Sequence, residues 1–399
     1  MKKITLTKDI EMILNVLNKF GKGYIVGGYI RDYLLGLEPK DCDFCTDIEY
    51  GKLKEIFKDY TPKEIGKSFG IIQIDFNGKK YEIAKLRKDI KFTNFRNIVE
   101  IEFVEDIKED LKRRDFTVNA IAFNGKELIY NSYLGKKDIE NKILRFVGEG
   151  EERIKEDPLR ILRGIRIAGE KELIIFESTK QDILKCKKEI KRVAIERVQD
   201  EFFKILKGKK SSNSVMLLKS LGILKELFPQ TSREINKSNT LNKLKKIDEY
   251  QNEDLILKLS IIFLKSQKEL EFLKLDNKTK KSILNIINNI DNINKESSFY
   301  EIKKLILNIG IDDFKSILEI RRLNEDFSDV IIKFEKIIKD KEPIFLKDLL
   351  ISGDDLIRLG IKDGKKIKKY LDKTLEIVLK NPKLNIKEYL LKRIEEDMI

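Results

Sequence analysis

The spacing of hydrophobic positions changes about a third of the way along the chain. Before that point, short apolar or alternating runs are separated by turns. Residues 71–76 and 81–84 flank an Asn-Gly pair, and residues 120–123 precede another. An Asn-Gly pair between two such runs is a strong hairpin signal. The first third is therefore predicted to contain a mixed sheet with helices beside it.

From about residue 139 onward, strand signals fade and apolar residues recur three and four positions apart, which is typical of helices that bury one face. The clearest examples are Ile256, Leu259 and Phe263, and Ile283, Ile286, Ile287 and Ile290. A polar stretch opened by Gly208 and the pair Asn381-Pro382 are predicted to end helical segments. The pattern predicts an α+β fold with several packing units, because 399 residues exceed one ordinary core.

The amino-acid composition restricts the possible catalytic chemistry more than it restricts the possible binding partner. The chain has 82 Lys and Arg against 68 Asp and Glu, a formal charge of +14, which suits a polyanion but also fits the lysine-rich bias of an AT-rich genome. The chain contains no histidine. Imidazole general bases, Ser-His hydrolysis and His-metal phosphohydrolase centres are therefore excluded within this chain. Carboxylates, metals, lysines or arginines must carry any catalysis.

Neither a membrane segment nor a cysteine-based site is expected. No apolar run approaches 18 residues and no signal-like segment opens the sequence, so we expect a cytoplasmic protein without membrane contact. Three cysteines cannot form a disulfide framework, and without histidine a zinc site is nearly excluded. The Cys42-x-x-Cys45 spacing is interpreted as accidental.

Near the N-terminus, a predicted strand at residues 24–26 leads into Gly27-Gly28 and a helix-like segment containing Arg31. Two glycines at a strand-to-helix turn let backbone N–H groups approach phosphate oxygens, and Arg31 is placed to clamp a triphosphate. Taken alone, such a pair more often means only a tight turn.

Two carboxylates follow this turn at positions i and i+2, namely Asp41 and Asp43. On a strand, such side chains point to the same face and repel each other unless a cation lies between them. Mg²⁺ prefers few protein carboxylates together with water and phosphates, and a pair of ions can activate a 3′-hydroxyl and stabilise a leaving pyrophosphate. An isolated Asp-x-Asp is common on surfaces, but about a dozen residues after a Gly-Gly turn it becomes specific.

Residues 27–36 and 41–43 together resemble the signature of the class II tRNA nucleotidyltransferase and poly(A) polymerase family, within the polymerase-β-like superfamily. Residues 109–120 are similar to the second motif of that family. The resemblance implies that Arg114 and Asn119 bind the ribose and phosphates of the nucleotide. It leaves two roles open for Asp115, which is either a third catalytic carboxylate or a residue that orients Arg114.

Residues 156–166 resemble the helix with which this family reads the incoming base. A carboxylate at Asp157 accepts from the exocyclic amino group that cytosine and adenine share, whereas uracil and guanine present a carbonyl there. Arg160, predicted one helical turn further on, donates to the adjacent ring nitrogen. Arg163 and Arg166 continue the spacing as nucleotide-binding candidates, and a solvated helix with i,i+3 ion pairs is the alternative for this segment alone.

The resemblance implies a division into a nucleotidyltransferase head (1–138), an all-α neck (139–207), a helical body (208–330) and a tRNA-binding tail (331–399). The implied activity is template-independent addition of CCA to the 3′ end of tRNA. CTP and ATP are the substrates, with Mg²⁺ on Asp41 and Asp43. Gly28, Arg31 and Arg114 are expected to hold the triphosphate. The tRNA is expected to be held at its acceptor stem and elbow by a monomer or weak dimer.

Two smaller motifs complete the resemblance. Residues 196–202 resemble the motif that closes the family's neck region, with Glu196 and Arg197 supporting the reading helix. Residues 352–367 look like the family's tail segment, where glycines that open helices beside lysines suit RNA phosphates, and helix capping is an equal alternative.

The sequence departs from the family at two places. Asn97 follows Arg96 where many relatives have histidine, and Asn131 stands where aspartate is usual, so both weaken any prediction about switching from C to A. The stretch from 87 to 96 has the full family length, which favours complete CCA addition, and residues 65–71 resemble the CCA-adding form rather than the poly(A) polymerase form.

Other functions remain open. Poly(A) polymerase activity, partial CC or A addition, and an RNA-binding protein on an inactive head are the alternatives. A transferase acting on small molecules would not need the long basic helical segments.

Overall fold

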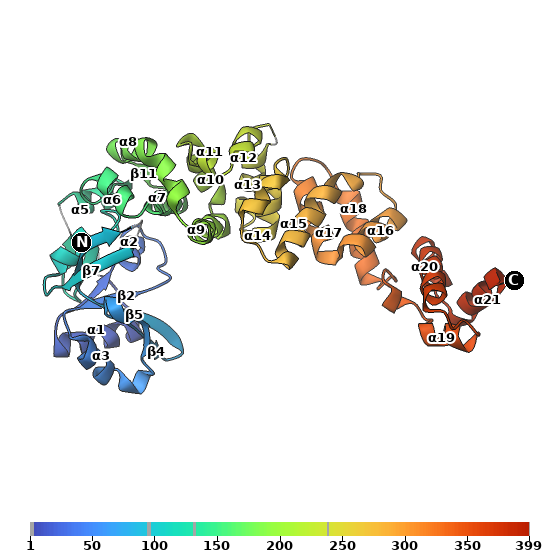
Figure 1. Ribbon diagram of the computed structural model, residues 1–399, viewed down its shortest axis with the longest axis horizontal. Coiled ribbons are helices and arrows are strands. Elements are labelled where there is room, and N and C mark those ends of the chain that lie inside the picture. The colour runs from blue at the N-terminus through green and yellow to red at the C-terminus, as the bar shows by residue number, and fades with distance from the viewer. Residues whose placement is uncertain (1–3, 94–96, 131–132, 238, 399) are drawn as a thin grey trace. The chain divides into compact units, whose positions relative to one another are not determined.

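The computed structural model describes residues 4–93, 97–130, 133–237 and 239–398 (Figure 1). The chain divides into two compact units, 1–233 and 234–399. This boundary lies inside the predicted body segment, and the four-part division stays a prediction. Within the described residues, no helix is long and apolar enough to cross a membrane.

The first unit is organised around a mixed seven-stranded sheet in the order β3-β4-β5-β2-β1-β8-β9. The β2–β5 pair is parallel and the other pairs are antiparallel, so the predicted mixed sheet is confirmed. Both predicted hairpins are present, and Asn77 and Gly78 adopt the positive φ angles of a tight hairpin turn. The strands are β1 (Gly23–Val26), β2 (Asp43–Thr46), β3 (Lys63–Gly66), β4 (Ile71–Phe76), β5 (Lys79–Lys85), β8 (Ile121–Phe123) and β9 (Leu128–Tyr130).

Helices pack on this sheet through a buried apolar cluster. Leu111 from α4 and Leu86 after β5 are fully buried together with Ala120 and Ala122. The helices around the sheet are α1 (Lys8–Phe20), α2 (Gly28–Leu34), α3 (Tyr50–Ile56), α4 (Ile107–Lys112) and α5 (Tyr133–Glu140), with short 3₁₀ turns η1 (Lys58–Tyr60) and η2 (Lys67–Phe69). This cluster fixes α4, and hence the arginines that follow it, against the end of β2.

A two-stranded antiparallel ribbon includes residues 87–93 of the stretch that has the full family length. It consists of β6 (Arg87–Thr93) and β7 (Asn97–Phe103). Alternating polar and apolar residues, as in the run from 98 to 103, favour such pairing. Of the two places where the chain departs from the family it resembles, Asn97 is the first residue of β7, whereas Asn131 lies outside the described residues, as does Arg96.

The remainder of the first unit is helical apart from one short strand pair. That pair, β10 (Ile143–Leu144) and β11 (Ile174–Ile175), is parallel and lies in the neck that was predicted to be all-α. The helices are α6 (Gly150–Glu156), α7 (Arg160–Lys171), α8 (Glu177–Cys186), α9 (Ile195–Lys207), α10 (Ser211–Ser220), α11 (Ile223–Leu227) and α12 (Pro229–Glu234), with η3 (Lys187–Arg192). α9 ends at Gly208, as predicted.

Helix α7 is held tightly against the sheet-bearing part of this unit. A Cβ atom at Gly164 would lie 2.7 Å from Cζ of Phe116, which stacks on Phe146 at 4.9 Å between ring centroids. Only glycine fits this approach. The neighbouring residue Arg163 is therefore brought to the residues that follow α4.

The second unit is all-helical in its described residues, which agrees with the helical spacing in the sequence. The predicted apolar stripes form α14 and α15, and α20 ends at Asn381, as expected. Its helices are α13 (Thr240–Glu249), α14 (Leu255–Phe263), α15 (Asn277–Asn289), α16 (Phe299–Ile309), α17 (Ile311–Arg322), α18 (Ser328–Lys339), α19 (Gly353–Arg358), α20 (Gly364–Lys380) and α21 (Lys387–Met398). The short 3₁₀ turns are η4 (Gln267–Phe272), η5 (Ile290–Asn292), η6 (Leu346–Asp348) and η7 (Pro382–Leu384).

Candidate active site

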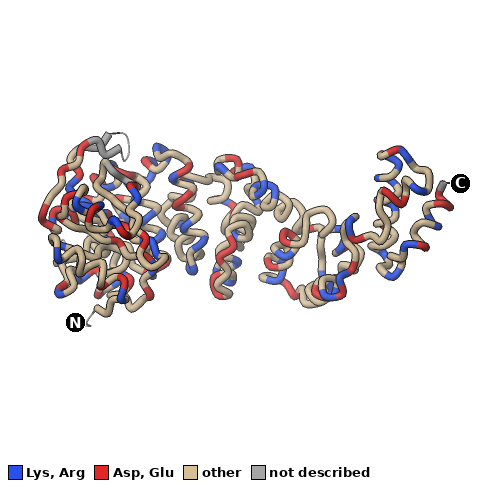
Figure 2. Tube along the Cα trace, turned by 90° about the horizontal axis from the view of Figure 1, so that it is seen from below, with Lys and Arg blue, Asp and Glu red and all other residues tan. Residues whose placement is uncertain are grey.

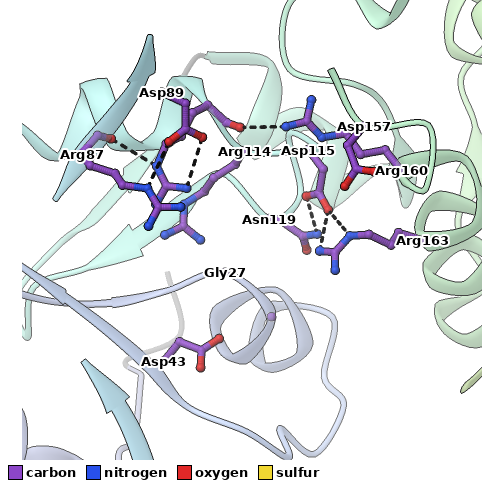
Figure 3. Close-up of a pocket in the computed structure, with 12 residues that line it drawn as sticks. Gly27, Asp43, Arg87, Asp89, Arg114, Asp115, Asn119, Asp157, Arg160 and Arg163 are labelled. Carbon is purple, nitrogen blue, oxygen red and sulfur yellow. Dashed lines mark hydrogen bonds and ion pairs between the residues drawn. The ribbon is translucent and has the colours of Figure 1, made fainter. Parts of the chain in front are cut away.

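A polar cavity of about 290 Å³ opens in the first unit where the end of the sheet, the segment after α4 and the start of α7 meet (Figure 3). All but three of the predicted site residues line it; Asp41, Arg31 and Arg166 do not. The lining residues are Gly27, Gly28, Asp43, Arg87, Asp89, Arg113, Arg114, Asp115, Asn119, Asp157, Arg160 and Arg163. Sequence motifs more than 100 residues apart thus share one cavity.

Asp43 begins β2 and faces the cavity, across from Arg114, Asn119 and Arg163 (Figure 3). Cys42 is buried whereas Asp41 and Asp43 are exposed, so side chains alternate as predicted even though Asp41 precedes the strand. Partial loss of hydration raises the pKa of Asp43; Arg114 opposes this rise and Asp41 adds to it.

The two aspartates fit a divalent cation because a positive ion between them relieves their mutual repulsion. Among the described residues, no group of three or more His, Cys, Asp or Glu side chains is close enough to hold a metal. A cation at this pair would take its other ligands from water and phosphate groups, which is the arrangement Mg²⁺ prefers.

A third carboxylate, Glu82 on β5, was missed by the sequence analysis. Its Cα pairs with that of Asp43 in the parallel β2–β5 register. Loss of hydration raises the pKa of Glu82, and Asp43 and Asp41 add to the rise. Only the pairing of β2 with β5 reveals this neighbour, because nothing in the sequence around residue 82 marks it.

The Gly-Gly turn brings backbone close to an arginine. Gly27 precedes α2 with φ 72° and ψ −126°, a conformation that side chains disfavour, and a Cβ there would lie 3.2 Å from Nη1 of Arg114. Gly28 follows as the first residue of α2. The turn and the Arg114 guanidinium therefore face the same space, where both can contact phosphate oxygens.

Asp110 holds the arginines of the second motif in place. Arg114 donates to its Oδ2 from Nη2 and Nε (3.0 and 3.2 Å), and Arg113 donates to its Oδ1 from Nη2 and Nε (2.6 and 2.9 Å). Burial alone would raise the pKa of Asp110, but Arg114 and Arg113 lower it. A carboxylate three and four residues before two arginines, at the end of a helix, is the signal that the sequence offered for this role.

Replacing Asp110 with Asn is expected to lower the free energy of unfolding by about 3 kcal/mol, because it leaves two arginines without their fully buried counter-charge. Urea denaturation followed by far-ultraviolet circular dichroism measures this change. Glu109→Gln on the same helix is the matched control; it removes an exposed pair with Lys112 and should change stability by less than about 1 kcal/mol. Equal effects of the two substitutions would contradict the assignment.

The same substitution has a predicted pH signature. Because the folded-state pKa of Asp110 lies below its unfolded value of about 3.9, its stabilising contribution is complete above that value and is lost as pH falls through the folded-state pKa. The unfolding free energy of Asp110→Asn should therefore depend less on pH below about 4 than that of the unmodified protein. A parallel dependence in both proteins would show that Asp110 is not a stabilising carboxylate.

Asp115 binds Arg163 rather than Arg114. Arg163 donates to Oδ2 of Asp115 from Nη2 and Nε (2.7 and 3.0 Å), while Asn119 Nδ2 donates to Oδ1 at 3.0 Å. Burial would raise the pKa of Asp115, but Arg163 and these hydrogen bonds hold it well below its usual range. With both oxygens engaged, Asp115 fixes the two side chains that flank the cavity, and its predicted link to Arg114 is not made by a hydrogen bond.

Arg31 lies behind the cavity lining. It is buried and donates from Nη1 to Oδ1 of Asn119 (2.7 Å) and from Nε to Asp32 (2.8 Å). Lys171 from α7 also reaches Asp32, at 3.0 Å. In this arrangement Arg31 positions Asn119, whereas the sequence had suggested a direct clamp on the triphosphate.

The predicted base-reading helix is interrupted at Asp157. α6 ends at residue 156, Asp157 has an extended backbone, and α7 begins at Arg160. Pro158 is the reason, because the residue before a proline is driven out of the helical conformation. Asp157 and Arg160 therefore do not lie one turn apart on a single helix, yet both line the cavity.

Arg197 on α9 holds Asp157 through both carboxylate oxygens, at 2.9 Å each. Arg197, which was predicted to support the base-reading helix, thus contacts the carboxylate of Asp157 directly. Arg160 pairs with Glu156 and donates from Nη2 to the carbonyl of Arg113 at 3.4 Å.

Arg166 points elsewhere on α7. Its Nε donates to Glu201 on α9 at 2.5 Å, and it does not line the cavity. A helix turns by about 100° per residue, so the six residues from Arg160 to Arg166 on α7 leave the two side chains about 120° apart around the helix.

Arg87, Asp89 and Arg113 complete the lining and were not predicted. Arg87 Nε donates to Oδ1 of Asp89 at 3.0 Å, and Arg113 Nε donates to the carbonyl of Arg87 at 3.1 Å. Burial and the neighbouring Arg113 lower the pKa of Arg87, while Asp89 opposes this. Arg87 and Asp89 come from β6, whose position beside α4 is a tertiary feature.

Comparison with known proteins agrees with this geometry. A family model described as the poly A polymerase head domain matches residues 23–145, and one described as a probable RNA and SrmB-binding site of polymerase A matches residues 173–235. The CCA-adding enzyme of Staphylococcus haemolyticus is 30% identical over 407 residues, covering 98% of each chain. The chain belongs to the CCA-adding enzyme family.

Other members of the family cover the chain to a similar extent. The CCA-adding enzyme of Bacillus subtilis is 29% identical over 95% of this chain and 96% of its own. The structure of the Bacillus stearothermophilus CCA-adding enzyme in complex with CTP has a TM-score of 0.80 at 24% identity, covering 98% of this chain and 99% of its own. The Thermotoga maritima CCA-adding enzyme complexed with tRNA has a TM-score of 0.70 at 20% identity, covering 100% and 97%. These structures confirm the α+β fold.

Proposed function

We propose that this CCA-adding enzyme extends the 3′ end of tRNA with C, C and A in the cavity of its first unit. CTP and ATP supply the nucleotides and pyrophosphate leaves. The observation that carries the proposal is the convergence of Asp43, the Gly27-Gly28 turn, Arg114 and Asp157 on one cavity of about 290 Å³. These groups provide metal binding, phosphate binding and base recognition.

The chain's own residues have separate tasks in this proposal. Gly28 and Arg114 bind the triphosphate, and Asn119, positioned by Arg31, binds the ribose or a phosphate oxygen. Asp115 keeps Arg163 oriented at the cavity wall. Because these groups are held in place before the substrate arrives, little reorganisation accompanies phosphoryl transfer.

Asp41 and Asp43 are the proposed ligands of a divalent cation, which we take to be Mg²⁺. When bound, it supplies activation of the terminal 3′-hydroxyl and neutralisation of charge on the phosphates. Glu82 lies next to this pair in the β2–β5 register and adds negative charge that strengthens cation binding. Hard oxygen ligands and a triphosphate substrate favour Mg²⁺ over thiophilic metals, and the chain offers no histidine to the site.

Base choice rests on Asp157, with Arg160 beside it. The Asp157 carboxylate, fixed by Arg197, accepts from the amino group that cytosine and adenine share, and rejects bases that present a carbonyl there. Arg160 donates to the adjacent ring nitrogen. The same two side chains serve both substrates, so no nucleic-acid template is required.

Two further parts of the proposal concern the helical regions and the cellular location. The second unit is rich in lysine on exposed helix faces, such as residues 365–369 of α20, which suits a sequence-independent grip on tRNA phosphates at the acceptor stem and elbow. Capping also occurs in this segment, because Ser352 and Asp355 form a capping box at α19. A cytoplasmic location follows from the proposed tRNA substrate.

A gel assay with tRNA lacking its 3′ CCA tests this function directly. With Mg²⁺, two additions are expected from CTP alone and a third only when ATP is also present, whereas UTP and GTP should give none. A long ladder with ATP alone would indicate poly(A) polymerase activity. Extension that stops at CC with both nucleotides would indicate a partial enzyme, and no extension would favour a binding protein.

Removal of divalent cations provides a separate prediction. Chelation should abolish extension without preventing tRNA binding, because phosphate contacts from lysine and arginine do not need the metal. Activity should return with Mg²⁺, and gel-shift titration of tRNA in the presence of chelator provides the control. Extension that persists in chelator would remove the cation from the mechanism.

A further inference from the structure

The second unit contains a charged cavity of about 200 Å³ that is unrelated to the active site. It lies between α13, the end of α14, the α15–η5 segment and the end of α17. Lys243, Lys265 and Arg321 contribute positive charge to its lining, and Asp291 and Glu325 contribute negative charge. In Figure 2, Lys and Arg are scattered among Asp and Glu throughout this unit. The convergence of three cationic side chains on one cavity is therefore a local feature of the unit.

Lys243 is the unusual residue of this cavity. It is only 8% exposed, and among the described residues no hydrogen-bond or ion-pair partner is found for its ammonium group. Two other buried lysines of the unit each face a carboxylate, Lys258 with Asp248 at 3.2 Å and Lys303 with Glu342 at 2.8 Å. Burying an unpaired charge destabilises the folded state. A contribution to stability therefore does not explain Lys243, in contrast to the two paired lysines.

The surroundings of Lys243 are also unfavourable for its charge. Its pKa is lowered by burial and by the neighbouring cations Lys265 and Arg321, while Asp291 opposes this shift. The Asp291 side chain is 80% exposed and is therefore screened by water. An anion bound beside Lys243 would relieve its repulsion by Lys265 and Arg321.

Arg321 supplies a second unsatisfied donor. Its guanidinium reaches Asp291 at 3.6 Å and Glu325 at 3.3 Å through the two Nη atoms, and it stacks over Phe327. Its Nε is buried and has no hydrogen-bond partner among the described residues. A buried N–H group that stays unpaired is uncommon and calls for a ligand or an ordered water.

We propose that this cavity is a binding site for a phosphate group, held by Lys243, Arg321 and Lys265. Its volume of about 200 Å³ is smaller than the roughly 290 Å³ of the proposed nucleotide cavity in the first unit, and it suits a small tetrahedral anion with its waters rather than a nucleotide. The phosphate is either that of a small free compound or one of an RNA backbone, which present the same oxygens to these donors.

Amide hydrogen exchange of the full chain, read by mass spectrometry, locates the binding and separates it from the active site. Inorganic phosphate is added at constant ionic strength, and exchange is followed in peptides covering residues 240–249 and 311–325. Slower exchange is expected in both segments, with the phosphate concentration for half-maximal protection about tenfold higher in Lys243→Met. Phosphate bound in the first unit would protect other peptides and would not depend on Lys243.

Two further variants separate phosphate binding from misfolding and from a general effect of positive charge. Lys265→Gln changes an exposed residue of the rim, so folding is not at risk, and it should also weaken the protection. Lys315→Gln removes an exposed positive charge of α17 and should leave the protection unchanged. Protection that is absent, or that is equal in all four proteins, would overturn the proposal.

A parallel series with tRNA lacking CCA identifies the source of the phosphate. Protection of the same segments by tRNA, lost in Lys243→Met, would assign the cavity to an RNA backbone phosphate. Protection by inorganic phosphate but not by tRNA would assign it to a free phosphate compound. This outcome is independent of the extension assay, since Lys243 has no part in the proposed catalytic site.

Discussion

Asp43→Ala is expected to lower the rate constant for nucleotide addition at least about 10³-fold, equivalent to roughly 4 kcal/mol of transition-state stabilisation. Asp43 is the one member of the predicted metal pair that lines the cavity, and it faces Arg114 across the space where phosphates would lie. Single-turnover incorporation of CTP into tRNA lacking CCA measures the effect. Asp41→Ala should behave similarly if both carboxylates hold the cation.

The binding of tRNA separates loss of chemistry from loss of structure. Gel-shift affinity for tRNA should change less than about threefold in Asp43→Ala, because RNA affinity rests on many phosphate contacts. Asp59→Asn, at an exposed position on η1, is the matched control and should retain full activity. If Asp43→Ala kept near-normal turnover, the metal assignment would be refuted.

Asp157→Ala is expected to relax the choice among the four nucleoside triphosphates by about 10- to 100-fold, the discrimination that one well-placed base contact provides. The ratio of kcat/KM for CTP to that for UTP is the measurement. The fall in this ratio should exceed the fall in kcat for CTP, since the residue distinguishes bases rather than carrying out phosphoryl transfer.

Arg197→Met offers an independent test of the same site. Arg197 binds both oxygens of Asp157 and does not line the cavity, so its loss should lower selectivity by freeing Asp157. Arg192→Gln, in which an exposed arginine paired with Glu189 is changed, should retain selectivity. Unchanged selectivity in both Asp157→Ala and Arg197→Met would move base recognition to other residues.

Asp41 and Asp157 show where a local sequence pattern predicts the local structure of a site residue correctly and where it does not. The alternation of Asp41, Cys42 and Asp43 follows from the two-residue period of a strand, and the structure keeps it even where regular pairing has not begun. For residues 156–166, helical spacing suggested one continuous helix, but Pro158 broke it. The motif still reached the cavity, because Gly164 lets α7 approach Phe116.

By itself the sequence determined the features that depend on near neighbours. These are the hairpin at residues 71–85, the amphipathic helices of the second unit, and the order of motifs that resembles the CCA-adding family. They rest on periodicity and turn chemistry, which act over a few residues. The absence of histidine likewise confines the chemistry to carboxylates, metals, lysines and arginines, because composition alone removes imidazole from every possible site.

Only the tertiary structure decided which side chains support one another. The pairing of β2 with β5 placed Glu82 beside Asp43, and the packing of α7 placed Arg163 on Asp115, 48 residues away in the chain. The lone buried charge of Lys243 likewise emerges only when four helical segments come together. Such contacts depend on which elements, distant in sequence, pack into one core, and on which charged side chains that core shields from water. The spacing of residues along a single segment determines neither the packing nor the shielding.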